Sequence, residues 1–225
     1  MCFDANQKLE FIYIIGSGFF INRDGYVLTA AHVIVALTNF GAEHQCSGGI
    51  YIPLTSWKDS NTTLKPIEIG ECISNADIDV AVCKAKSNPF LDIDVKNNIY
   101  ALRFASVAVY DDGSAVAFTG FPLEMVAPVT SKGYIASYLT PKKELVIDKN
   151  TWPGASGSPV YDERGIVLGM IIKRGLDEGT GLAYARPADS IIEFLREKKI
   201  TAQQEDNKHR QPVSKPSKRR RLHTT

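Results

Sequence analysis

Short apolar runs separated by turn residues dominate the chain as far as Pro187. The runs recur about every ten residues, and apolar residues with helical spacing are nearly absent from this part. Many short strands at regular spacing are typical of an all-β barrel or sandwich. The clearest candidate strands are YIPL, KPIEIG, DVAVCKA, AVAFTG, GYIASYLT, ELVID, GSPVYD, GIVLGMIIK and GLAYAR.

Three segments predict more specific local structure. GFFINRDGYVLTA predicts a hairpin, because two apolar runs flank residues 22–25 and Gly25 adopts the left-handed turn conformation without strain. The following AAHVIVAL predicts a short helix. A second helix is predicted over 188–199, where Ser190 and Glu193 have the spacing of a capping box ahead of an apolar stripe.

The last 25 residues differ sharply in composition from the rest. Residues 201–225 hold seven Lys or Arg and two Asp or Glu, a net charge of +5, which leaves −4 for the remainder of a chain whose total is +1. They contain too few apolar residues to offset the entropy of ordering. We therefore predict one globular domain over 1–200 and a disordered basic tail over 201–225.

The cysteines and the N-terminal apolar run indicate in which cellular compartment the protein is expected. FIYIIGSGFFI is shorter than the roughly 20 residues of a membrane helix, and Asp4 and Glu10 flank it where a secretion signal would be positive. The four cysteines have no zinc-ligand spacing, so no zinc site is expected from them. They are predicted to be reduced thiols of a cytoplasmic protein, or a nuclear one in a eukaryotic host. They are Cys2, Cys46, Cys72 and Cys83.

Ser156 stands between two glycines in TWPGASGSPV, either as a nucleophile or as part of a turn. A nucleophilic serine needs a histidine as its base and a carboxylate to orient that histidine. His209 and His223 lie in the predicted tail, and His44 is expected among polar loop residues. His32, at the end of a strand that enters a helical turn, is therefore the candidate base.

The candidate carboxylate comes from NADIDVAVCK, which offers Asp77 and Asp79. Asp79 directly precedes the apolar strand and is favoured, while Asp77 stays an alternative. Gly154 would let the backbone approach a substrate closely. The N–H groups of Gly154 and Ser156 would then aim at one developing oxyanion.

Six segments occur in the order found in trypsin-like serine peptidases, over about residues 16–195. The chain resembles most the bacterial high-temperature-requirement type and related single-domain peptidases. The resemblance implies two antiparallel six-stranded β-barrels of the chymotrypsin fold, at about 10–108 and 109–186, followed by the helix at 188–199. The segments are GSGFFINRDGYVLTAAHVI, DVAVCK, FTGFP, VTSKGYIAS, PGASGSPVYDERGIVLGM and GLAYARPADSIIEFL.

The resemblance also implies residue roles, with His32 as general base, Asp79 as its orienting acid and Ser156 as nucleophile. The chain order His, Asp, Ser is the chymotrypsin-type order, whereas an α/β-hydrolase runs Ser, Asp or Glu, His. The amides of Gly154 and Ser156 would form the oxyanion hole.

The same resemblance places Asn150 near the floor of the pocket for the substrate residue before the cut. Ala183 and Ala185 would line that pocket. Because no acid stands at Asn150, we expect small or medium apolar side chains to be preferred over Arg or Lys.

Two functions follow from these patterns. The first is a serine endopeptidase that cleaves proteins or peptides through an acyl-enzyme, without a cofactor. The alternative is a catalytically silent protease fold that binds a partner, nucleic acid or anionic lipid through its basic tail. Arg219, Arg220 and Arg221 are few for firm binding, and no aromatic residue is interleaved to stack on bases. The sequence favours the endopeptidase.

Overall fold

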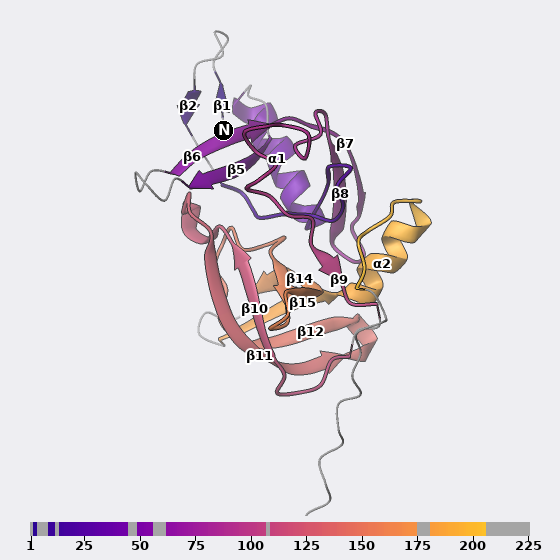
Figure 1. The fold of residues 1–225 in the computed structure, drawn as a ribbon. Helices are drawn as coiled ribbons and strands as arrows, with labels where there is room; N and C mark the ends of the chain where they lie inside the picture. The colour runs from indigo at the N-terminus through magenta and orange to yellow at the C-terminus, as the bar shows by residue number, and fades with distance from the viewer. Residues whose placement is uncertain are drawn as a thin grey trace, which may run out of the picture.

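The protein folds into two stacked halves of β-structure, which lie one above the other in Figure 1. The structure is a computed structural model, and it describes residues 2–3, 9–11, 14–44, 49–55, 62–106, 109–174 and 181–205. Within those ranges, no helix is both long enough and apolar enough to cross a membrane. The sequence predicts an all-β fold, and the structure is mostly β in these ranges, with two helices.

The C-terminal half is a closed antiparallel barrel of six strands. The strands pair in the order β13-β10-β11-β12-β15-β14, and β14 pairs again with β13 to close the ring. A short strand, β9 (Arg103–Phe104), adds to β14 in parallel. The barrel strands are β10 (Ala115–Gly120), β11 (Val129–Leu139), β12 (Glu144–Asp148), β13 (Pro159–Tyr161), β14 (Ile166–Arg174) and β15 (Leu182–Pro187). Two short 3₁₀ turns, η1 (Pro122–Glu124) and η2 (Thr140–Lys142), lie in its connections.

The described strands of the N-terminal half form separate sheets instead of the predicted closed six-stranded barrel. One sheet has the order β3-β4-β8-β7, and β5 pairs with β6 alone. Pro53 in β5 and Pro66 in β6 lack the N–H group that would extend the ladder to a further strand. The strands are β1 (Cys2–Phe3), which pairs with β2 (Leu9–Phe11), β3 (Phe19–Phe20), β4 (Tyr26–Thr29), β5 (Ile50–Thr55), β6 (Thr62–Ile67), β7 (Ile69–Asn75) and β8 (Val80–Ala85).

The hairpin and both helices predicted from the sequence are present. β3 and β4 flank the turn in which Gly25 has a φ of +83°. The first helix, α1, spans Ala31–His44, so it is longer than the predicted AAHVIVAL and includes His44, which was expected in a loop. The second, α2, spans Ala188–Glu197. The capping box is wrong, because the helix begins earlier than the Ser-x-x-Glu pattern suggests. Pro187 is the cap residue, and the buried Ser190 hydroxyl finds no hydrogen-bond partner among the described residues.

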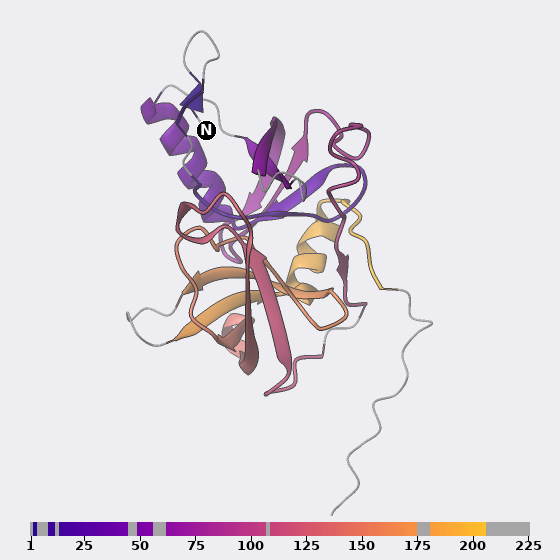
Figure 2. The same cartoon turned by 60° about the vertical axis from the view of Figure 1, so that its left-hand side comes forward.

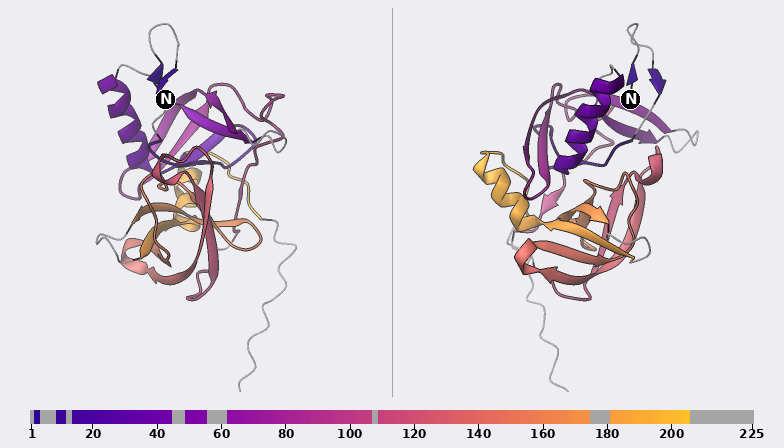
Figure 3. Two further views of the ribbon diagram at one scale, coloured as in Figure 1. Left: turned by 90° about the vertical axis from the view of Figure 1, so that its left-hand side faces the viewer. Right: turned by 180° about the vertical axis from the view of Figure 1, so that it is seen from behind.

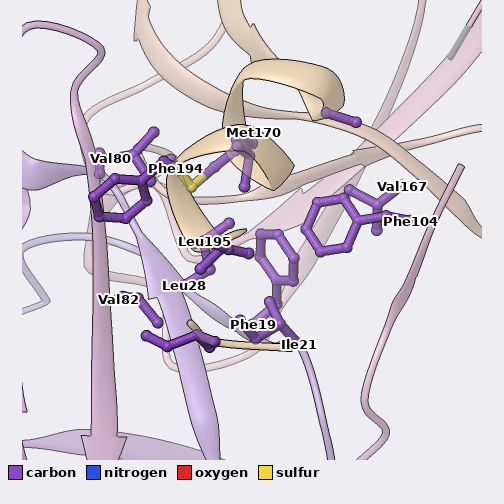
Figure 4. Close-up of a cluster of buried hydrophobic side chains, with 14 of the residues drawn as sticks. Phe19, Ile21, Leu28, Val80, Val82, Phe104, Val167, Met170, Phe194 and Leu195 are labelled. Atoms are coloured by element: carbon purple, nitrogen blue, oxygen red, sulfur yellow. The ribbon is translucent and has the colours of Figure 1, made fainter. Parts of the chain in front are cut away.

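A shared hydrophobic core joins the two halves (Figure 4). Side chains of β3, β4 and β8 pack there against β9, β14 and α2, whose apolar stripe faces inward. In Figures 2 and 3 the helix α2 lies beside the junction of the halves. The members drawn and labelled are Phe19, Ile21, Leu28, Val80, Val82, Phe104, Val167, Met170, Phe194 and Leu195. The relative position of the halves is therefore set largely by packing.

The first residues of the predicted disordered tail are ordered. The N–H of Phe104 donates to the Gln203 carbonyl, and the N–H of Gln203 donates to the Ile21 carbonyl at 2.8 Å. The Asn22 amide also donates to the Thr201 carbonyl at 2.7 Å. Hydrogen bonds to both halves thus hold residues 201–205. The prediction of disorder rested on amino-acid composition, which does not indicate such bonds. The rest of the predicted tail, 206–225, lies outside the described residues.

Two of the four predicted thiols are joined. Cys72 on β7 and Cys83 on β8 are direct cross-strand partners and form a disulfide, with their Cα atoms 4.1 Å apart. The spacing of 11 residues carried no metal signal, and only the strand register brings the two sulfurs together. Cys46 and the side chain of Cys2 lie outside what the structure describes.

Candidate active site

His32, Asp79 and Ser156 line one cavity of about 370 Å³ at the junction of the two halves. His32 lies in the first turn of α1, and Asp79 ends the turn between β7 and β8. Ser156 comes from the C-terminal half, in the loop between β12 and β13. Three residues far apart in the sequence therefore meet. The other lining residues are Thr151, Trp152, Pro153, Ile172 and Lys173.

The carboxylate of Asp79 holds His32 through two contacts. Its Oδ2 atom lies 2.7 Å from His32 Nδ1, and its Oδ1 accepts the backbone N–H of His32 at 3.0 Å. The side chains of His32 and Asp79 are 49% and 25% exposed, so the pair borders the solvent. Asp77, the alternative carboxylate, is exposed, and its backbone N–H donates to Asn75. The geometry thus pairs Asp79, and not Asp77, with the histidine.

The turn that presents Asp79 is held in a strained conformation. Asp79 has a φ of +54°, in the left-handed region that side-chain-bearing residues rarely adopt. Asn75 Oδ1 accepts the backbone N–H groups of Asp77 and Ile78, which folds the turn on itself. The Arg186 guanidinium donates to the Ile78 carbonyl at 2.7 Å. Contacts within the turn and the contact from Arg186 together hold Asp79 in place beside the His32 ring.

Arg186 reaches this turn from the other half of the molecule. It lies on β15, is 4% exposed, and also donates to the carbonyls of Lys142 and Lys143. Burial lowers the pKa of its guanidinium, while the nearby carboxylates of Glu144 and Asp79 raise it. Glu144 in turn pairs with Lys173, at the edge of the cavity, at 2.8 Å. A buried cation thus connects the C-terminal barrel to the Asp79 turn.

The loop before Ser156 presents two backbone N–H groups. Gly154 has a φ of +91°, and a Cβ added there would collide with the Phe121 carbonyl, so this position requires glycine. The Pro153 carbonyl accepts the N–H of Leu123 at 2.8 Å. Because a trans peptide places its C=O and N–H on opposite sides, the Gly154 N–H points away from that bond. Neither this N–H nor that of Ser156 has a partner among the described residues.

Ser17 of the N-terminal half clamps the same loop. Its hydroxyl donates to the Gly154 carbonyl at 2.7 Å and accepts the N–H of Phe121 at 2.9 Å. Its own N–H donates to the Ser156 carbonyl at 2.7 Å. With both carbonyls occupied, the loop cannot rotate its peptides freely. Neither Ser17 nor Arg186 was recognisable from the sequence, because Ser17 contacts Gly154 from 137 positions away and Arg186 contacts Ile78 from 108 positions away.

The residues proposed for the substrate pocket are not among the lining residues of the cavity. Asn150 is exposed and directly precedes Thr151, which does line the cavity. Ala183 and Ala185 are fully buried in the core of the C-terminal barrel. Trp152, which is 50% exposed, and Lys173 border the cavity instead. Within the described ranges, no three His, Cys, Asp or Glu side chains are grouped so as to hold a metal ion.

Comparison with protein families matches residues 16–170 to the trypsin-like peptidase domain. The chain belongs to the trypsin-like peptidase family. The match includes all three residues that meet in the cavity, in the order His, Asp, Ser. The resemblance inferred from the sequence motifs is confirmed.

Individual relatives and solved structures agree with this family. The chain is 27% identical to the putative protease Do-like 14 of Arabidopsis thaliana over 193 residues, which cover 80% of this chain and 40% of that protein. It is 29% identical to a probable periplasmic serine endoprotease, DegP-like, of Halomonas elongata, covering 80% and 34%. The chain thus spans well under half the length of these trypsin-like relatives. The crystal structure of the active form of the Rv3671c protease of M. tuberculosis shares the fold, with a TM-score of 0.58 at 21% identity, covering 84% of this chain and 75% of that one.

Proposed function

We propose that this protein is a serine endopeptidase that hydrolyses peptide bonds through an acyl-enzyme. The observation that carries the proposal is the 2.7 Å contact between His32 Nδ1 and Asp79 Oδ2 in the cavity that Ser156 also lines. An ionised Asp79 accepts the Nδ1–H of His32, which leaves Nε2 as the acceptor for the serine proton. Family membership supports the same chemistry.

In the proposed first step, the Ser156 oxygen attacks the carbonyl carbon of the substrate while its proton passes to His32 Nε2. The negative charge that forms on the carbonyl oxygen is bound by the N–H groups of Gly154 and Ser156. The carbon–nitrogen bond then breaks, and His32 returns the proton to the leaving amine. A water molecule then attacks the ester that joins the substrate to Ser156, and His32 takes the proton of the water and returns it to the serine oxygen.

The structure bears on the preference for the residue before the cut. Lys173 and Trp152 border the cavity, and Glu144 is bonded to Lys173. Asp79, which is paired with His32, is the one carboxylate among the described lining residues. We propose that small or medium apolar side chains bind there in preference to Arg or Lys, as the absence of an acid at Asn150 suggests.

Labelling with a fluorophosphonate probe tests the proposal. The probe should attach to Ser156, as found by peptide mapping, because it reacts with a serine activated by its base and an oxyanion hole. Ser156→Ala should abolish labelling, and His32→Ala should lower peptidase activity by at least about 10³-fold. The exposed Ser87 provides a matched control, and Ser87→Ala should label as wild type. Peptidase activity that survives Ser156→Ala would refute the assignment.

A further inference from the structure

A second groove, of about 570 Å³, leads away from the loop that carries Gly154. Pro153 and Gly154 line it, and Pro153 also lines the cavity of the candidate active site, so the groove adjoins that cavity. Its walls come from the chain before β3, from α1 and from the η1 turn. The apolar side chains that line it are Ile14, Ile15, Ala36, Phe40 and Leu123.

One face of α1 runs from His32 along this groove. Ala36, Phe40 and Glu43 follow His32 at intervals of four, four and three residues, which places all of them on the same side of a helix. At about 1.5 Å per residue, the distance from His32 to Glu43 is about 16 Å. An extended peptide of four or five residues has that length, at about 3.3 Å per residue. Figures 2 and 3 show α1 extending from the junction of the halves along the N-terminal half.

The direction of the groove indicates which part of a substrate it holds. In the proposed reaction His32 protonates the leaving amine, so the residues after the cleaved bond begin beside His32. The face of α1 that continues from His32 leads into the groove. The cavity on the other side of Pro153 contains Ile172 and Lys173 and is left for the residues before the bond.

We propose that this groove binds the two or three substrate residues that follow the cleaved bond and selects apolar side chains among them. The inference rests on the proposed function and extends it to the substrate. Leu123 is 57% exposed, and Ala36 leaves open space on α1 for an incoming side chain. Both surfaces leave water when an apolar side chain enters. Glu43, the charged residue of the lining, lies at the far end, three turns from His32.

A library of internally quenched peptides, varied at the first three positions after the bond, tests the preference. Peptides with Leu or Phe at one of these positions should show kcat/KM at least about tenfold above peptides with Asp there, as expected for burying a large apolar side chain. Equal kcat/KM for Leu, Phe and Asp at all three positions would overturn the proposal.

Two variants of α1 locate the effect in the groove. Ala36→Asp places a charge on the groove face, while Thr38→Asp places the same charge on an exposed position two residues away, on the opposite face. Each variant is assayed with the best library peptide and with a p-nitroanilide that carries the same residues before the bond and none after it. The ratio of the activity on the peptide to the activity on the p-nitroanilide should fall at least about tenfold in Ala36→Asp. It should stay at the wild-type value in Thr38→Asp. An unchanged ratio in Ala36→Asp would contradict the proposal.

The groove can also be tested apart from catalysis. In a Ser156→Ala background, fluorescently labelled peptides with Leu or with Asp after the bond are titrated by anisotropy. The Leu peptide should bind more tightly, and Ala36→Asp should remove the difference. A wild-type protein that hydrolyses nothing would refute the proposed function, whereas equal binding of the two peptides would refute the groove.

Discussion

The two halves of the molecule differ in how their strands are closed. The C-terminal half is a complete ring around a core whose central side chains, such as Leu145, Ile147 and Val160, have no exposed surface. The N-terminal half has one sheet of four described strands and two separate strand pairs, β1-β2 and β5-β6. Residues of the four-stranded sheet, of β5 and β6 and of α1 line an apolar cavity of about 140 Å³, to which Phe121 and Val126 of the C-terminal half also contribute. The closed half presents Ser156 and Gly154, and the open half presents His32 and Asp79. The site is therefore assembled across a boundary between a well-packed and a less well-packed half.

This difference indicates where the site needs support. Ser156 and Gly154 lie in a loop anchored at both ends in the closed barrel. Asp79, with its left-handed backbone, lies on the open half and depends on contacts from elsewhere. Two supports of its turn can each be removed by one substitution: the Arg186 guanidinium, which comes from the closed half, and the Cys72–Cys83 disulfide, which joins the two strands that flank the turn.

Removing the Arg186 guanidinium should have the largest effect on both stability and activity, because it links the closed half to the Asp79 turn of the open half. Arg186→Met deletes three hydrogen bonds to backbone carbonyls, one of them to Ile78 of the Asp79 turn, and leaves Glu144 with less compensation. We expect the free energy of unfolding in urea to fall by about 3 kcal/mol or more. We also expect kcat to fall more than KM rises, because the turn that orients His32 is loosened. Arg103 is exposed, so Arg103→Met should change neither quantity measurably. An Arg186→Met protein with wild-type kcat would show that the open half positions Asp79 by itself.

Breaking the disulfide should have a smaller effect, confined to the open half. The bond encloses the turn with Asp79 in a loop of about a dozen residues, for which a stabilisation of about 2–3 kcal/mol is expected. Dithiothreitol should therefore lower the urea midpoint of the wild-type protein. Cys72→Ala should start at the lowered midpoint and show no response to the reductant. A wild-type midpoint that ignores dithiothreitol would mean that the disulfide does not support this half.

The parts of the fold and site predictable from the sequence are those written in local patterns. The hairpin at Gly25, the helix after it and the strands of the closed barrel follow from runs of apolar residues and turn signals. Segments in family order pointed to His32, Asp79 and Ser156, which the structure brings together. The roles of Ser17 and Arg186 were not predictable. A serine among glycines or an arginine in a strand has no distinctive local pattern, and its role depends on the residues that it contacts in the folded protein.

The failures have the same cause. The Ser-x-x-Glu pattern at Ser190 does not form a capping box, since the cap residue of the helix is Pro187, three residues before Ser190. The closed first barrel implied by the family resemblance is not confirmed among the described strands, where Pro53 and Pro66 restrict what β5 and β6 can pair with. The order of residues 201–205 comes from backbone bonds to Phe104 and Ile21, which side-chain composition cannot report.

The smallest predicted effect concerns the access of water to the apolar cavity of the open half. Tyr51 on β5 lines its apolar cavity, and burial raises the pKa of the Tyr51 phenol to about 12. A pKa raised in the folded state contributes stability below about pH 10, the ordinary value of tyrosine, which is lost as the pH rises toward about 12. The urea midpoint should therefore decline over this interval, and less so in Tyr51→Phe.

Absorbance titration of tyrosinate, wild type minus Tyr51→Phe, measures the same group directly. Tyr110, in the closed half, is the matched probe, because burial and the charge of Asp189 raise the pKa of its phenol too. The Tyr51 difference should appear near pH 12, while Tyr110 should remain neutral over the range in which Tyr51 ionises. If Tyr51 instead titrates near pH 10, water reaches the cavity freely, and the open half is held chiefly by its ties to the closed barrel. If it titrates near pH 12, its own apolar packing excludes water despite the unclosed sheets.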